Sequence, residues 1–70
     1  MRNTLKIERA RKNVTQAELA EKLYVSRLTI HSIETGKFNP SVQLALKLAR
    51  YFSVQVEDLF ILEDEDYLKQ

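Results

Sequence analysis

The sequence has no cysteine and no tryptophan, and it contains only one glycine, one proline and one histidine. The missing cysteines exclude disulfides and thiolate metal sites, and one histidine cannot build a zinc site alone. Apolar runs are a few residues long, whereas a membrane-spanning helix needs about 20. The start, "MRNTLKIERARK", is charged throughout and lacks the apolar segment of a signal peptide. We therefore expect a cytoplasmic protein with no metal and no membrane contact.

Motifs for catalysis are also missing. The sequence contains no glycine-rich phosphate loop, no HExxH metal motif and no set of residues that could act as nucleophile and base. We therefore expect neither an enzyme nor a cofactor nor a small-molecule substrate. A binding protein is the remaining class, and its partner has to be inferred from charge and from motifs.

Charge is unevenly distributed along the chain, although the net charge is only +1. Residues 1–50 carry ten lysines and arginines against four acidic residues, whereas residues 51–70 carry one lysine against six acids. A basic body suits a polyanionic partner such as nucleic acid. An ordinary solvated surface is the alternative, and the charge distribution taken alone favours it.

Hydrophobic periodicity predicts helices along the chain, since apolar residues recur at helical spacing and only the ends leave room for a strand. Seventy residues form one small domain. The breaks between the periodic segments are short, so we expect an all-α fold, a compact five-helix bundle. The helices are expected over residues 4–12, from Thr15, from Ser26 to Thr35, from Pro40–Ser41 and from about Val56.

Two helix boundaries have specific signals. Thr15 and Glu18 have the spacing of a capping box, in which the threonine side chain caps the helix and the glutamate bonds back to the threonine backbone. Gly36 is placed to end the third helix in a left-handed conformation. These signals predict that residues 16–35 form two short helices joined by a tight turn.

This helix pair has the pattern of a helix-turn-helix. Ala20 is small enough to let two helices cross closely, where leucine would push them apart. Ile30 and Ile33 bury one face of the second helix. At about 100° per residue, the opposite face presents Leu28, Thr35, Ser32 and His31, with Arg27 on the flank.

The exposed face of this second helix suits a DNA groove. Its side chains are mostly short, so the backbone could approach a grooved partner closely. Serine, threonine and arginine hydrogen-bond base edges or phosphates, and leucine can contact a thymine methyl group. A solvated surface helix is the alternative, and for His31 a peripheral position is the more common one.

The segment "TQAELAEKLYVSRLTIHSIETGKFNPSVQLALKLARYFSVQVEDLF" resembles the helix-turn-helix domain of lambdoid phage repressors, Cro proteins and many small bacterial regulators, the Cro/C1-type (XRE) family. The resemblance covers residues 5–60 and is most specific in "TQAELAEKL", "VSRLTIHSIETGK", "NPS" and "VEDLF". It implies a lambda-repressor-like fold with double-stranded DNA as the partner. It also implies a homodimeric transcriptional regulator, which we expect to be a repressor of a palindromic operator.

The resemblance also implies roles for individual residues. Family members contact DNA phosphate through a glutamine at the position of Gln16, and base edges or nearby phosphates through the recognition helix. Arg27 would read a guanine or contact a phosphate. An ion pair between Arg9 and Glu34 would tie the first helix to the third. The expected DNA contacts are Gln16, Ser26, Arg27, Leu28, Ser32, Lys37 and Asn39, the last two in the loop that contacts backbone phosphates.

Two residues depart from the family pattern. Tyr24 stands in the turn where the family usually has glycine, so it would be strained if the turn keeps a positive φ. Leu28 stands where the family commonly has glutamine, which removes a bidentate reader of adenine. Leu28 either contacts a thymine methyl group or reads no base, so this departure concerns base preference rather than DNA binding.

The C-terminal segment "LFILEDEDYL" combines apolar residues with a run of acids. Ile61 and Leu62 have no obvious partner within the chain, which suits a dimer contact or a short edge strand. In the regulators that the chain resembles, the terminal segments can form a small β-structure and dimers assemble near the fifth helix. We expect a dimer interface at Leu59, Phe60, Ile61 and Leu62, a DNA-binding domain over residues 1–62 and a flexible acidic tail over residues 63–70.

A second function class competes with the DNA-binding regulator. The chain could be an antitoxin, or an antagonist of another regulator, which uses the same fold as a protein-interaction module. Its apolar C-terminal end would then bind the partner. A toxin gene beside the gene for this chain would favour that alternative, whereas a salt-sensitive complex with its own promoter would favour the regulator.

Overall fold

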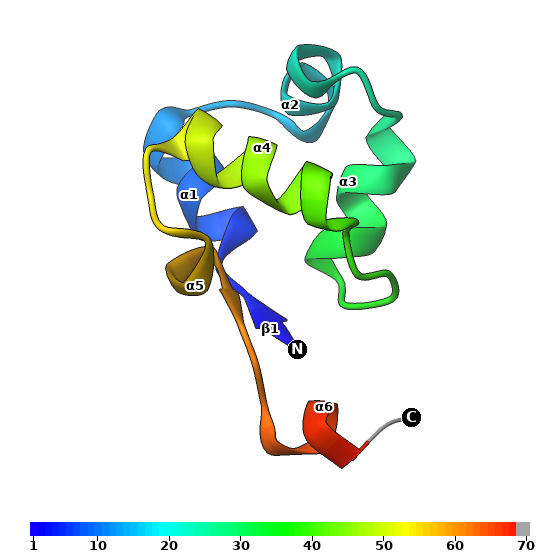
Figure 1. Cartoon of the computed structure of the whole chain (residues 1–70). Helices are drawn as coiled ribbons and strands as arrows, with labels where there is room; N and C mark the ends of the chain where they lie inside the picture. The colour runs from blue at the N-terminus through cyan, green and yellow to red at the C-terminus, as the bar shows by residue number, and fades with distance from the viewer. Residues whose placement is uncertain (69–70) are drawn as a thin grey trace.

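The computed structural model describes residues 1–68, which contain six helices and two short strands joined by loops (Figure 1). The predicted helical body is confirmed, together with a short two-stranded sheet of the terminal kind that the resemblance implied, and the structure adds a sixth helix. Positions 69 and 70 of the expected acidic tail lie outside the described residues. The strands are β1 (Arg2–Asn3) and β2 (Phe60–Ile61), and the helices are α1 (Leu5–Lys12), α2 (Gln16–Leu23), α3 (Arg27–Glu34), α4 (Val42–Phe52), α5 (Val56–Leu59) and α6 (Asp64–Leu68).

Side-chain caps determine where α2, α3 and α4 begin. Thr15, Ser26 and Ser41 each accept a hydrogen bond from the backbone N–H three residues ahead. The predicted capping box is present, because the Glu18 carboxylate also accepts the backbone N–H of Thr15 at 2.8 Å. That hydrogen bond is the main cause of a lowered pKa for Glu18. The stability it contributes is present above the unfolded-state pKa and is lost as the pH falls through the lower folded-state value.

The core lies where α2 and α3 meet α1, α4 and α5. Ala20 is 3% exposed, and its carbonyl accepts the backbone N–H of Val25 at 3.0 Å, which closes the turn between α2 and α3. Because Ile30 and Ile33 of α3 are buried against this centre, the opposite face of α3 points away from the body. The buried side chains are Leu5, Leu19, Ala20, Leu23, Ile30, Ile33, Leu48, Ala49, Phe52, Leu59 and Phe60.

The two strands join the ends of the domain. They pair antiparallel, with Arg2 opposite Ile61 and Asn3 opposite Phe60, so the small terminal β-structure implied by the resemblance is present. The Asn3 side-chain amide donates to the Ile33 carbonyl at 3.0 Å, which connects this sheet to the end of α3. Sequence reasoning missed Asn3 because nothing near it in the chain indicates a partner in another helix.

The acidic C-terminal segment contains helix α6 over Asp64–Leu68, and the flexibility expected for residues 63–70 stays a prediction. Three acids lie in the first turn, where the helix dipole favours negative charge. The Asp66 carboxylate accepts the backbone N–H of Glu63 at 2.8 Å and the Met1 ammonium group at 3.0 Å. The sequence does not indicate this helix because Met1 reaches Asp66 only once β1 and β2 have paired.

Tyr24 ends α2 in the left-handed conformation, with φ 58° and ψ 42°. This conformation is strained for a residue that has a Cβ atom. The Tyr24 side chain is 93% exposed, so its removal takes away few packing contacts. Replacing Tyr24 with glycine should therefore raise the free energy of unfolding by about 1 kcal/mol, measured by urea denaturation.

Tyr24→Ala is the matched control, because alanine removes the aromatic ring but keeps the Cβ atom. We expect alanine to leave the free energy of unfolding within about 0.5 kcal/mol of the original value. An equal gain from glycine and alanine would assign the effect to the exposed ring instead of the backbone.

Candidate nucleic-acid interface

The outward face of α3 carries the residues expected to contact bases. Leu28 is 64% exposed, Arg27 is exposed as well and Ser32 is half-buried. His31 is exposed beside them. The side chains of Leu28 and Ser32 are short, so a groove could approach the α3 backbone closely along this face.

Ser26 has a role within the chain. Its hydroxyl oxygen accepts the backbone N–H of Thr29 at 3.1 Å and lies 2.9 Å from the Thr29 hydroxyl oxygen. These bonds cap α3 and orient Thr29. The expected DNA contact of Ser26 stays a prediction. The Ser26 hydroxyl group would have to contact DNA while it also caps α3.

Gln16, at the start of α2, is held by a shielded ion pair. Its amide Nε2 donates to Glu34 Oε1 at 3.1 Å. The Glu34 carboxylate also accepts two hydrogen bonds from the Arg9 guanidinium, one of them from Nη2 at 3.1 Å. The side chains of Arg9 and Glu34 are only 16% and 5% exposed. The ion pair implied by the resemblance is present, and it also orients the Gln16 amide, which sequence reasoning missed.

Arg27 binds the other end of the same amide. Its Nη1 donates to Gln16 Oε1 at 3.1 Å. A guanidinium has five N–H donors, so most of those on Arg27 are available to a base or a phosphate. Nδ1 of His31 lies 3.4 Å from Gln16 Nε2, which is at the long limit for a hydrogen bond. His31 therefore lies at the edge of this group.

The loop after α3 is positioned by its glycine. Gly36 has φ 79°, as predicted for the residue that ends the helix. The backbone N–H groups of Gly36 and Lys37 donate to the carbonyls of Ile33 and Ser32 at 3.1 and 3.0 Å, which is the Schellman pattern. Lys37 and Asn39 are exposed on this loop, so both could meet phosphates beside the groove that α3 would enter.

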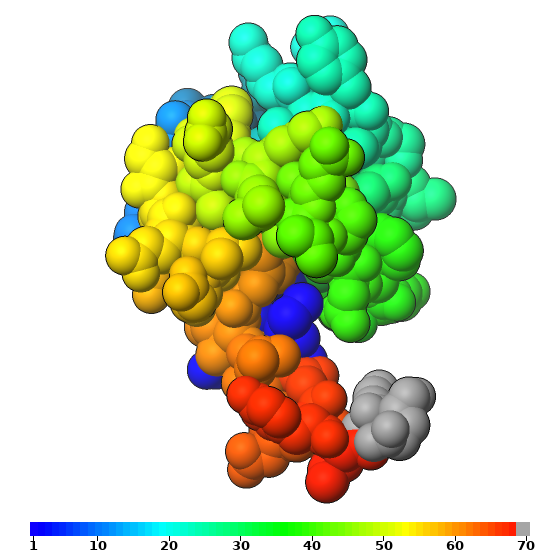
Figure 2. Space-filling view, in the orientation of Figure 1, coloured from blue at the N-terminus to red at the C-terminus, as the bar shows by residue number. Residues whose placement is uncertain are grey.

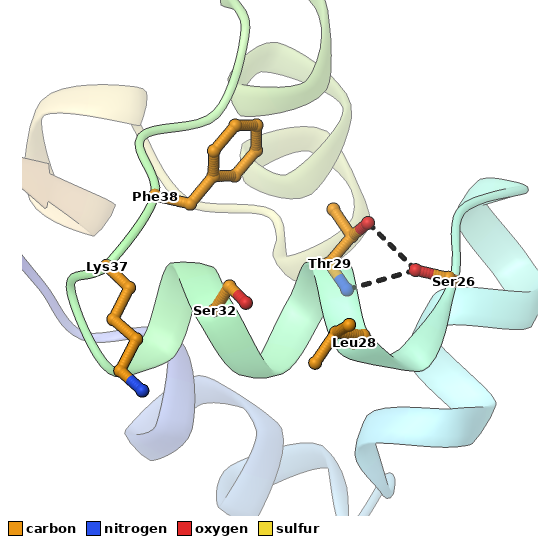
Figure 3. A pocket seen from close by; sticks show the side chains of 6 residues that line it. All are labelled: Ser26, Leu28, Thr29, Ser32, Lys37 and Phe38. Atoms are coloured by element: carbon orange, nitrogen blue, oxygen red, sulfur yellow. Dashed lines mark hydrogen bonds between the residues drawn. The ribbon is translucent and has the colours of Figure 1, made fainter.

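A shallow hollow of about 260 Å³ lies between α3 and this loop (Figure 3). Phe38, which is 51% exposed, was not predicted as a site residue, because the sequence does not show that the loop folds back beside the helix. Figure 3 shows Phe38 and Thr29 on the same side of α3, with Phe38 above Ser32. The hollow thus combines apolar walls with hydroxyl groups. Its lining residues are Ser26, Leu28, Thr29, Ser32, Lys37 and Phe38.

The expected dimer residues do not share one surface. Leu59 and Phe60 are 0% and 8% exposed in the single chain, which corrects their assignment to a dimer interface, because side chains that fill the core leave no surface for a partner. Ile61 is half-buried and belongs to β2, so the edge-strand alternative holds for it. Leu62 is 59% exposed.

Residues 1–68 contain no group of three or more side chains that could hold a metal ion. None of the helices described in this range is long and apolar enough to cross a membrane. The arrangement that remains is a pair of crossed helices with one exposed helix face, flanked by Gln16 and Lys37. These features define a helix-turn-helix protein with a candidate DNA-binding face.

Comparison with known proteins agrees with this class. A family model described as helix-turn-helix matches residues 5–59. An HTH-type transcriptional regulator of Methanocaldococcus jannaschii is 54% identical over 66 residues, which cover 94% of this chain and 100% of the relative. The HTH-type transcriptional regulator YgzD of Bacillus subtilis is 44% identical over 66 residues, with the same coverage. The HTH-type transcriptional activator BcrR of Enterococcus faecalis is 41% identical over 56 residues, which are 80% of this chain and 28% of BcrR.

The chain therefore belongs to the Cro/C1-type (XRE) family of helix-turn-helix transcriptional regulators. Its coarse function follows from that family: it binds DNA and acts in the regulation of transcription. Members of this family are not generally enzymes.

Proposed function

We propose that this protein is a sequence-specific repressor that binds a palindromic DNA operator as a homodimer. The outer face of α3 carries this proposal, because Arg27 and Leu28 are exposed there between Gln16 at one end and Lys37 at the other. In the proposed complex α3 enters the major groove, where the pattern of donors and acceptors distinguishes all four base pairs.

The contacts divide into positioning and reading contacts. Gln16, Lys37 and Asn39 would position the protein through phosphates, while α3 reads the bases. Glu34 holds Nε2 of Gln16, so the second N–H of this amide is the donor that a phosphate would take, in place of the long contact to His31. An amide held in advance loses less conformational freedom on binding.

The homodimer would place two copies of α3 in half-sites roughly 34 Å apart, one turn of the DNA. The exposed side chain of Leu62 supports a contact between copies near the C-terminal end of the domain. A dimer on its operator excludes other proteins from that stretch of DNA, which is why repression is the regulatory outcome that we propose.

Selection of bound sequences from random double-stranded DNA tests this function. We expect an enriched inverted repeat with half-sites about 10 base pairs apart, and binding that weakens steeply as salt is added. Enrichment of a single asymmetric half-site would refute the palindrome, and the absence of any enriched sequence would refute sequence-specific binding. A reporter gene behind the selected operator then tests repression, because activation would give the opposite change.

The antitoxin or antagonist alternative is favoured by one observation. Tyr67 and Leu68 are 71% and 79% exposed next to Leu62, which is a large apolar surface for a short segment. This alternative would replace our proposal if no DNA sequence is enriched and the chain instead forms a stable complex with the product of a neighbouring gene.

Leu28→Gln tests direct reading of a base. We expect preference at one position in each half-site to move from thymine to adenine, since leucine contacts a methyl group and glutamine bonds adenine at two atoms. The discrimination gained should be about 1–3 kcal/mol, measured by repeating the selection with the variant. Ile7→Gln, at a 53% exposed position on α1, is the matched control. An unchanged selected sequence would show that Leu28 reads no base.

A further inference from the structure

Helix α6 makes little apolar contact with the rest of its own chain. None of its residues is buried. Figure 2 shows it projecting from the end of the body. Ion pairs attach this segment to the N-terminus. The Met1 ammonium group lies 3.0 Å from the carboxylate of Asp66 in α6 and 3.3 Å from that of Glu63, just before the helix. These contacts hold the segment in place and leave its outer surface open.

The open surface of α6 combines apolar and acidic side chains. Tyr67 and Leu68 are 71% and 79% exposed, and Leu62, just before the helix, is 59% exposed. Asp64 and Glu65 are exposed as well, and neither takes part in an ion pair within residues 1–68. A partner for this surface needs an apolar patch beside positive charge.

The outer face of α4 has this complementary character. Gln43, Leu46, Lys47 and Arg50 surround a hollow of about 280 Å³ on the helix surface. Leu46 is 55% exposed, and Lys47 and Arg50 form none of the ion pairs found among the described residues. This α4 hollow therefore presents one exposed leucine next to two cations that form no ion pair within residues 1–68.

The two surfaces cannot meet within one molecule as it is folded. In Figure 1, α4 crosses the body, whereas α6 lies well beyond it at the end of an extended segment. The ties from Met1 to Glu63 and Asp66 keep α6 in that position. A surface on α6 that matches α4 is therefore accessible only to the α4 of another molecule.

We propose that α6 of one copy docks in the α4 hollow of a second copy, and that the second copy returns the same contact. Asp64 and Glu65 of each copy pair with Lys47 and Arg50 of the other, while Tyr67 and Leu68 cover Leu46. A two-fold arrangement makes every contact twice, which doubles the area that a single short helix could bury. This inference rests on the proposed homodimer and assigns a surface to it.

Charge reversal on each side separately tests the contact. Lys47→Glu with Arg50→Glu makes both surfaces acidic, and Asp64→Lys with Glu65→Lys makes both basic. Each double variant should raise the dissociation constant of its own homodimer by roughly thirtyfold or more, measured by sedimentation. An equal mixture of the two should form a heterodimer, because both reciprocal contacts are then between opposite charges.

Leu46→Ser tests the apolar part without altering α6 and should also shift the chain toward monomer. Dimers that survive all these changes would overturn this contact while leaving the proposed DNA-binding dimer intact. A wild-type chain that sediments as a monomer would overturn both. If the α4 reversal weakens DNA binding but leaves the dimer unchanged, Lys47 and Arg50 are phosphate contacts and the proposal is wrong.

Discussion

Replacing Glu34 with alanine should lower the free energy of unfolding by about 3 kcal/mol. The Glu34 side chain is 5% exposed and pairs with Arg9, which is 16% exposed. Without the carboxylate, the Arg9 guanidinium keeps one acceptor, the Val14 carbonyl at 3.0 Å, and its charge stays shielded from water. A chain of this size is stabilised by about 4–10 kcal/mol in total, so urea denaturation should detect the loss easily.

Glu8→Ala is the matched control for this substitution. Glu8 also pairs with an arginine, at 3.4 Å; the Glu8 side chain is 14% exposed, but the side chain of Arg11 is 72% exposed, so this pair is open to water on the arginine side. Ion pairs in contact with water contribute about 0–1 kcal/mol, so we expect a loss in that range. If the two alanine variants lose equal stability, shielding of the Arg9–Glu34 pair is not what makes it strong.

A double variant separates the stability of Glu34 from its position beside Gln16. Replacing both Arg9 and Glu34 with leucine leaves no shielded charge unpaired, so much of the stability should return. This double variant should still bind the operator more weakly than the wild-type chain, because its Gln16 amide has lost the acceptor that orients it. Normal operator affinity in this folded double variant would show that Glu34 does not position Gln16 for DNA.

Arg27→Ala should weaken binding to the selected operator by about 1–3 kcal/mol per half-site, or roughly 5- to 150-fold. Arg27 is exposed and its bond to Gln16 joins two surface side chains, so the free energy of unfolding should change little. Titration of the operator and of random DNA, at two salt concentrations, measures the effect. A larger loss on the operator than on random DNA identifies a base contact.

Arg27→Lys distinguishes the two roles left open for this residue. Lysine keeps the charge but not the planar pair of donors that bonds guanine at two atoms. We expect lysine to lose most of the specific affinity if Arg27 reads a guanine. If lysine binds as well as arginine, and alanine weakens both DNAs equally, Arg27 is a phosphate contact.

Local signals made the helix-turn-helix predictable. The capping box of Thr15 and Glu18, the caps at Ser26 and Ser41, and the helix-ending Gly36 each involve residues within a few positions of one another. The strained turn at Tyr24 was also implied, because one position in a known motif defines the backbone conformation. For this reason the bounds of α2, α3 and α4 match the expected ones closely.

Predictions that depended on distant neighbours were less complete. Ile61 pairs with Arg2 in a sheet, and Phe60 fills the core instead of a dimer surface. The acidic segment is helical over Asp64–Leu68, and Met1, at the other end of the chain, supplies a partner for Asp66. Composition alone indicated a solvated tail, since it does not say which charges meet after folding.

The sequence by itself determined helices α1 to α5, the caps of α2, α3 and α4, and the exposed face that carries Arg27 and Leu28, because these follow from helical periodicity and from contacts along a few residues of chain. Only the tertiary structure decided what surrounds that face. It brought Glu34 to Gln16, placed Phe38 beside α3 and left all residues of α6 outside the buried core. Each of these depends on how close residues from separate elements come, which is set by packing and not by local sequence.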